Sequence, residues 1–190
     1  QLSVTSGINA MAHAAEGLYA QDANPIMSLF AEEGIRALAQ GLPKIVSSPG
    51  DIAARSKCLY GAWLCGAVLG NVGMALQHKL CHTLGGTYNL PHAETHTVVL
   101  PHALAYNAPA VPEAIDRIAR ALGVGDAARG MFDLAASLGA PTALKDIGMP
   151  EGQLDWCAEI ATQNAYANPR PIEKAAIRAL LEDAYHGKRP

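Results

Sequence analysis

Histidines gather in one short window of this 190-residue chain. Of the seven in the sequence, five fall inside that window: His78, His82, His92, His96 and His102. Imidazole is a neutral metal ligand and the acid–base group that works near neutral pH, so the clustering indicates chemistry. The surrounding Ala, Leu and Gly at helical spacing are typical of a scaffold.

The spacing of these side chains suggests how they could meet. His78 and His82 are four residues apart and share one helix face, and His92 follows a double glycine that could fold it back. Upstream, Asn9 and His13 are also four residues apart on another predicted helix. A divalent cation such as Fe or Zn takes three or four ligands from different elements. One candidate ligand set is Asn9, His13, His78 and His92. His82 would remain as an acid–base or substrate group.

Plainer explanations compete with these roles. Paired histidines one turn apart also occur by chance, and a lone histidine such as His13 is more often structural. We expect His102 to be a satisfied structural histidine and His186 to be solvated. Most lysines face solvent. Lys79, however, follows an uncharged segment of about twenty residues, so its ammonium could instead face a pocket. Glu16 could cap a helix or pair at the surface, or it could accept a hydrogen bond from His13.

Composition limits the possible partners. Half of the residues are hydrophobic, 16% are charged and the formal net charge is −3. Without a block of Lys or Arg, these values argue against a nucleic-acid partner. The four cysteines form no CxxC pair, which favours free thiols in a reducing, cytoplasmic setting. The N-terminus lacks the basic and apolar regions of a signal peptide.

Helical periodicity accounts for most of the chain, and no strand of useful length is predicted. The expected fold is all-α, a multi-helix bundle formed by residues 1–190. The predicted helices start near Thr5, then cover about 26–42, 51–85 with a break near Gly70, 94–107, 112–122, 126–138, 151–163 and 171–184, with caps at Asn24 and Asp51.

One segment could be mistaken for a membrane span. Residues 58–77 carry no charge and are long enough to cross a bilayer. Glycines, Asn71 and Gln77 dilute this segment, and it runs directly into the histidines. We therefore expect a buried central helix and no membrane partner.

Two motifs resemble a known family. GINAMAHAAEG (residues 7–17) and HKLCHTLGGTYNLPHAETHTVVLPH (residues 78–102) are similar to the C-terminal helical domain of the iron-containing alcohol dehydrogenase superfamily, which has a dehydroquinate-synthase-like fold. The resemblance is dense through about Gly123 and looser beyond. It implies metal-ligand positions at Asn9, His13, His78 and His92. It also implies that His82 lies near the nicotinamide cofactor and the substrate.

Two departures from the alcohol dehydrogenase pattern indicate a subgroup. Asn9 stands where metal-binding members carry Asp, so one anionic ligand is missing and a dication would be held less tightly. Residues 92–96 read HAETH where alcohol dehydrogenases usually read HGxAN. Both features resemble the maleylacetate reductases.

This resemblance implies an activity. Maleylacetate reductases reduce a carbon–carbon double bond to give 3-oxoadipate, using NADH or NADPH, during aromatic-compound degradation. Hydride addition would create an enolate that a donor must stabilise and an acid must protonate. We assign His82 (or His78) as the acid. The groups assigned to bind the dicarboxylate and stabilise the anion are His13, His92 and Lys79, with Lys79 also supporting catalysis.

The same resemblance implies a second domain. The family binds its nicotinamide through an N-terminal α/β domain with a glycine-rich phosphate loop, and no GxGxxG-like loop is found in this sequence. We therefore expect a C-terminal domain that is inactive alone and belongs to a homodimer. Two alternatives stay open: a metal-dependent alcohol dehydrogenase domain with Asn9 as a weak ligand, and a non-catalytic helical metal-binding or interaction domain.

Overall fold

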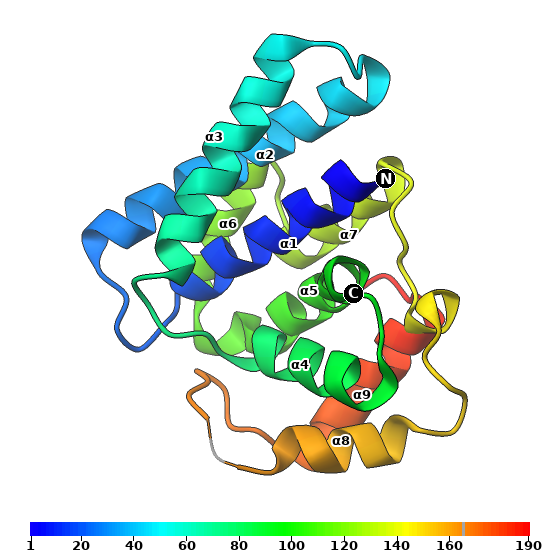
Figure 1. Ribbon diagram of the computed structural model, residues 1–190. Coiled ribbons are helices and arrows are strands. Elements are labelled where there is room, and N and C mark those ends of the chain that lie inside the picture. Colours follow the sequence, from blue (N-terminus) through cyan, green and yellow to red (C-terminus); the bar gives the residue numbers. More distant parts are fainter. Residues whose placement is uncertain (165) are drawn as a thin grey trace.

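The chain folds into helices joined by short turns (Figure 1). The computed structural model describes residues 1–164 and 166–190, and no β-strand occurs among them. The elements are α1 (Leu2–Gly17), α2 (Pro25–Ser47), α3 (Ile52–Leu69), α4 (Leu76–Tyr88), α5 (His92–Asn107), α6 (Pro112–Leu122), α7 (Ala127–Ser137), α8 (Leu154–Thr162) and α9 (Lys174–His186), with short 3-10 turns η1 (Ala108–Ala110) and η2 (Leu144–Ile147). The predicted all-α fold is confirmed.

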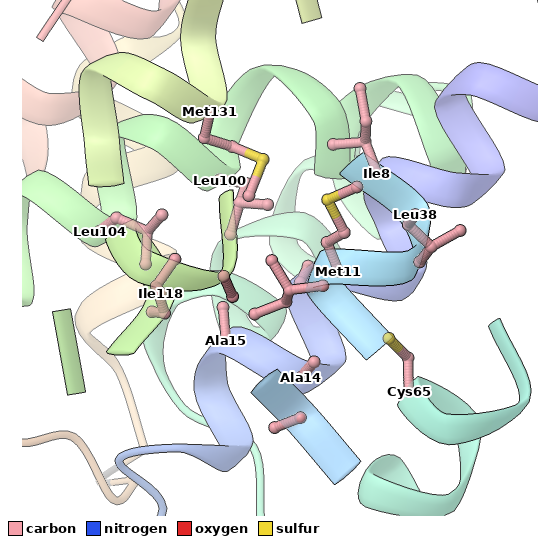
Figure 2. Packing of buried hydrophobic residues seen from close by; sticks show 14 of the residues in the cluster. Ile8, Met11, Ala14, Ala15, Leu38, Cys65, Leu100, Leu104, Ile118 and Met131 are labelled. Atoms are coloured by element: carbon pink, nitrogen blue, oxygen red, sulfur yellow. The ribbon is translucent and has the colours of Figure 1, made fainter. Parts of the chain in front are cut away.

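Helix α1 lies at the centre of a first apolar core (Figure 2). It contributes the fully buried side chains of Ile8, Met11 and Ala15. The other helices around it contribute Leu38 of α2, Cys65 of α3, Leu100 and Leu104 of α5, Ile118 of α6 and Met131 of α7. Because α1 is covered on several sides, its buried polar groups must find partners inside the protein.

Helix α5 separates this core from a second one. Leu100 and Leu104 face the first core, whereas Val98, Val99 and Ala103 pack into a second core with α4, α8 and α9. A helix packed between two cores is buried on both sides, and every residue of α5 from Thr95 to Leu104 is buried. Burial on two sides also explains why the β-branched run in α5 is helical, since packing overrides intrinsic propensity.

Side-chain caps set two helix starts where the sequence predicts them. Asn24 Oδ1 accepts a hydrogen bond from Met27 N at 3.0 Å, and Asp51 Oδ1 accepts one from Ala54 N at 3.0 Å. Each cap satisfies a backbone donor that the first helical turn leaves unpaired. The predicted bounds of α6 also match the structure.

Other predicted boundaries are wrong. Helix α1 begins at Leu2 rather than near Thr5, and α2 continues to Ser47. The double glycine does not end α4, which runs on to Tyr88. Its stop is Asn89, whose φ of 53° is left-handed, a conformation that Asn adopts more readily than most residues.

The uncharged segment 58–77 is not one helix. The break near Gly70 is confirmed, because α3 ends there and α4 starts at Leu76. The expectation of a buried central helix is wrong for α3, which packs on one side only. Leu64 is buried, whereas Leu59 and Trp63 are 72% and 65% exposed. Among the described residues, no helix is long and apolar enough to cross a membrane.

Glycines allow α2 and α3 to cross closely. A Cβ added to Gly61 would lie 3.0 Å from the carbonyl oxygen of Gly34 and 2.9 Å from Leu38 Cγ. A Cβ added to Gly34 would lie 2.7 Å from Cys65 Sγ. The two backbones therefore approach at a distance that only glycine permits.

Candidate active site

Five imidazole rings from three helices gather where α1, α4 and α5 meet. The ring centroid of His13 on α1 lies 5.0 Å from that of His78 on α4. His78 lies 6.1 Å from His82 and 4.8 Å from His96 on α5, and His92 lies 4.5 Å from His96. The structure thus brings together side chains that the sequence analysis grouped from separate segments.

The cluster has a buried floor and an exposed rim. His78 is 6% exposed and His96 is fully buried, whereas His82 and His92 are exposed and His13 is half-buried. A ligand that arrives from solvent would therefore meet His82 and His92 first.

His96 has a central place in the cluster, although its position in the sequence predicts no role for it. Its centroid lies 6.3 Å from that of His13, and it is closer still to His78 and His92, so it contacts all three. The signal for it in the sequence was the HAETH segment (residues 92–96), which ends in this histidine.

Glu16 anchors the first buried ring. Its side chain is fully buried, and its carboxylate accepts hydrogen bonds from the backbone N of Ala75 (3.0 Å) and of Gln77 (2.7 Å). Glu16 Oε2 also lies 2.6 Å from His78 Nδ1. The carboxylate therefore caps the first turn of α4 and orients the ring. The suggested pairing of Glu16 with His13 is wrong, because α4 begins against α1 and brings His78 to the carboxylate.

Gln77 anchors the second buried ring. Its side chain is fully buried, and Nε2 donates a hydrogen bond to the backbone oxygen of His96 at 3.0 Å. The same nitrogen lies 3.4 Å from His96 Nδ1. Because Gln77 precedes His78 directly, the first turn of α4 fixes rings on two helices.

Burial lowers the pKa of three of the clustered rings. Desolvation, with the neighbouring His78 and His92, lowers the pKa of His13 to about 4. The same causes lower the pKa of His96 to about 2, because this ring is the more deeply buried. Partial burial lowers the pKa of His82 as well. At neutral pH the rings of His13 and His96 are therefore neutral.

Lys79 brings a positive charge to the rim. Its side chain is half-buried, and Nζ lies 5.6 Å from the ring centroid of Tyr166, within cation–π range. Its charge is also one of the causes that lower the pKa of His82. The charge of Lys79 therefore acts on His82, one of the two exposed rings.

The two remaining histidines lie outside this cluster. His102 is buried beside the second core, and burial lowers its pKa to about 4. Its Nε2 has no hydrogen-bond partner among the described residues, so the expectation that this histidine is hydrogen-bonded at both ring nitrogens is wrong. His186 is exposed at the end of α9, 3.0 Å from Glu182, as a solvated histidine should be.

The predicted metal ligands can be tested against the geometry. Within residues 1–164 and 166–190, no three His, Cys, Asp or Glu side chains are placed to hold a metal ion together. Asn9 Oδ1 and His78 Nε2 are buried atoms without partners in that part of the chain, so single donors exist. The set of Asn9, His13, His78 and His92 nevertheless contains no anion to offset the dehydration of a dication. As placed, the described side chains therefore form no three-residue ligand group, and the metal site stays a prediction.

A hollow of about 530 Å³ lies near the start of α4. Tyr19, Asp22, Ala75 and Asn168 are among its lining residues, and none of the clustered histidines is. The Asp22 carboxylate in its wall accepts a hydrogen bond from Gly73 N at 2.9 Å. A wall that carries an anion is unsuited to a dianionic ligand, so the histidine face remains the better candidate.

Comparison with known proteins bears on this arrangement. The family described as Fe-containing alcohol dehydrogenase family, C-terminal, matches residues 3–185. The maleylacetate reductase of Burkholderia cepacia is 60% identical over 190 residues, which make up 100% of this chain and 54% of that protein. The chain thus spans about half the length of the curated relatives it matches.

Solved structures show the same relationship. The maleylacetate reductase from Agrobacterium tumefaciens has a TM-score of 0.96 and 58% identity, covering 98% of this chain and 53% of that one. The maleylacetate reductase from Rhizobium sp. strain MTP-10005 has a TM-score of 0.96 and 57% identity, again covering 98% of this chain and 53% of that one. The chain belongs to the iron-containing alcohol dehydrogenase family, and it corresponds to the C-terminal helical domain.

Proposed function

We propose that this chain forms the substrate-side half of a reductase that converts maleylacetate to 3-oxoadipate with NADH or NADPH. The observation that carries the proposal is the convergence of five imidazoles from α1, α4 and α5 on a face with an exposed rim. The high identity to maleylacetate reductases supports this substrate over a simple alcohol. The neutral Asn9 supports it too, because a metal-dependent alcohol dehydrogenase would hold its dication less tightly without an anionic ligand there.

The reaction makes defined demands on the protein. A bound nicotinamide would supply hydride, with its electron pair, to the alkene carbon farther from the ketone. The π electrons of the double bond move toward the ketone oxygen and form an enolate. A proton then reaches the carbon next to the ketone, which gives 3-oxoadipate and the oxidised nicotinamide. The protein must bind two carboxylates, stabilise the enolate and supply that proton.

The rim of the cluster can meet these demands. We assign His82 as the proton donor, with His78 as the alternative, because His82 is exposed and His78 lies directly behind it. His13, His92 and Lys79 are assigned to bind the carboxylates and to stabilise the enolate. Lys79 provides the fixed positive charge, and the rings provide hydrogen bonds.

Further parts of the proposal concern the whole protein. The nicotinamide would bind mainly to an N-terminal dinucleotide-binding domain, with its reactive ring near His82. The assembly would be a homodimer. A cytoplasmic location agrees with the free thiols of Cys58, Cys65, Cys81 and Cys157.

An assay of the full-length protein tests the function. Maleylacetate-dependent oxidation of NADH or NADPH that survives a metal chelator would support the proposal. Turnover of simple alcohols that requires added Fe or Zn would instead identify a metal-dependent alcohol dehydrogenase. Tight metal uptake with neither activity would identify a non-catalytic metal-binding domain.

A further inference from the structure

The two buried rings of the cluster are anchored in opposite ways by the first turn of α4. His78 faces a carboxylate, which accepts hydrogen bonds, and His96 faces an amide nitrogen, which donates them. A neutral imidazole carries its proton on one ring nitrogen only, and its partners decide which one.

Glu16 determines the proton position on His78. Its carboxylate oxygens already accept from the backbone N of Ala75 and Gln77, so the group acts as an acceptor on that side. The 2.6 Å contact of Glu16 Oε2 with His78 Nδ1 therefore requires a proton on Nδ1. In the neutral ring, His78 Nε2 is left with a lone pair.

Gln77 determines the proton position on His96. The identity of its Nε2 is fixed because this atom lies 3.0 Å from the backbone oxygen of His96, which can only accept. The same nitrogen lies 3.4 Å from His96 Nδ1 and 3.6 Å from Cys81 Sγ. Because an amide nitrogen cannot accept a hydrogen bond, a proton on Nδ1 would face another donor, so Nδ1 is the unprotonated nitrogen. The ring proton of His96 must then lie on Nε2.

The remaining nitrogens of the two rings are complementary. His78 Nε2 and His96 Nε2 are both buried, and neither has a hydrogen-bond partner within the described part of the chain. The ring centroids lie 4.8 Å apart with an interplanar angle of 68°. One ring thus offers a lone pair and its neighbour offers an N–H.

We propose that Glu16 and Gln77 are positioning residues that hold His78 and His96 in opposite tautomers. His96 then offers an N–H inside the cluster, whereas His78 offers a lone pair behind His82. This use of the polarity rests on the proposed function. The tautomers themselves are a property of the folded chain.

Nuclear magnetic resonance of the full-length protein with nitrogen-15-labelled histidine tests the proposal. His78→Ala and His96→Ala each remove one ring signal and so assign the two rings. We expect an Nδ1–H pattern for His78 and an Nε2–H pattern for His96 in the unmodified protein. The same tautomer on both rings would overturn the proposal, whatever the enzyme activity.

Two conservative variants test whether Glu16 and Gln77 set the tautomers of the two rings or only fill space beside them. Glu16→Gln should change the His78 pattern and leave that of His96 unchanged, because an amide cannot accept at both oxygen positions. Gln77→Met should change only the His96 pattern. If the proposed function holds, each variant should also lower kcat by about ten- to a hundredfold while KM changes little. Native tautomers in both folded variants would show that Glu16 and Gln77 do not set them.

Discussion

The crossing of α2 and α3 and the junction of α1, α4 and α5 are both closely packed, but by different means. The crossing relies on Gly34 and Gly61, which let two backbones approach, and on aliphatic side chains around them. The junction instead buries polar groups that include Glu16, Gln77, His78, Thr95 and His96. Each such group costs free energy unless it is paired, so the junction is a specialised region rather than a better core.

Because the two regions are built differently, we expect substitutions in them to affect different properties of the protein. Substitutions at the α2–α3 crossing should change the free energy of unfolding and leave the chemistry of the rim intact. Substitutions at the rim should do the reverse. Only the anchors below the rim, such as Glu16, should affect both.

The largest effect is expected at the rim. His82→Ala in the full-length protein should lower maleylacetate turnover by about 10²–10⁴-fold, because the proton donor is lost. The melting temperature should stay the same, since His82 is exposed. His186→Ala, another exposed histidine, is the matched control and should keep full turnover. Equal turnover in both variants would remove His82 from the mechanism.

The next largest effect is expected at the anchor. Glu16→Ala should destabilise the protein by about 3–5 kcal/mol, because it leaves backbone donors and His78 without their buried partner. Urea unfolding measures this free energy. The control Glu33→Ala removes a half-exposed carboxylate paired with Arg36 and should cost at most about 1 kcal/mol. Similar losses in the two variants would contradict the anchoring role.

An intermediate effect is expected from pH. The pKa of His102 is about 4 in the folded chain and about 6.5 when unfolded, so the unfolded state binds the proton more readily. Stability therefore falls as pH drops from about 6.5 towards 4. Between pH 7 and pH 5 this histidine alone should account for about 2 kcal/mol. Urea unfolding of His102→Leu at both pH values should show a dependence smaller by that amount, and an unchanged dependence would refute the assignment.

The smallest effect is expected at the helix crossing. Gly61→Ala places a methyl group against Leu38 and the Gly34 carbonyl, so it should cost about 1–3 kcal/mol despite the better helix propensity of Ala. Gly66→Ala on the same helix meets no atom within 4 Å and should be neutral or stabilising by up to about 1 kcal/mol. Thermal unfolding compares the two, and equal stabilities would show that the crossing is not tight.

Local signals in the sequence predict much of this molecule. Caps such as Asn24 and Asp51 are read from neighbouring residues, and the four-residue spacing of His78 and His82 fixes their common face. The exposure of α3 could not be predicted, because its apolar residues occur on both faces and only tertiary packing selects one. The end of α4 at Asn89 was also not predicted, because the double glycine before it is the stronger local signal for a helix end.

The sequence was least informative about partners far apart in the chain. Nothing local indicates that Glu16 faces His78, because this contact exists only after α4 packs on α1. The central place of His96 depends in the same way on the approach of α5 to α4. The type and spacing of residues identified the histidines that could act, while long-range packing determines which of them are anchored.

A crystal structure of the full-length protein with nicotinamide and an unreactive analogue of the dicarboxylate substrate tests the central claim most directly. The account predicts one carboxylate within hydrogen-bonding distance of His13, His92 or Lys79, and the reacting carbons beside His82. An analogue bound away from these side chains, with the histidine face turned to solvent, would contradict it.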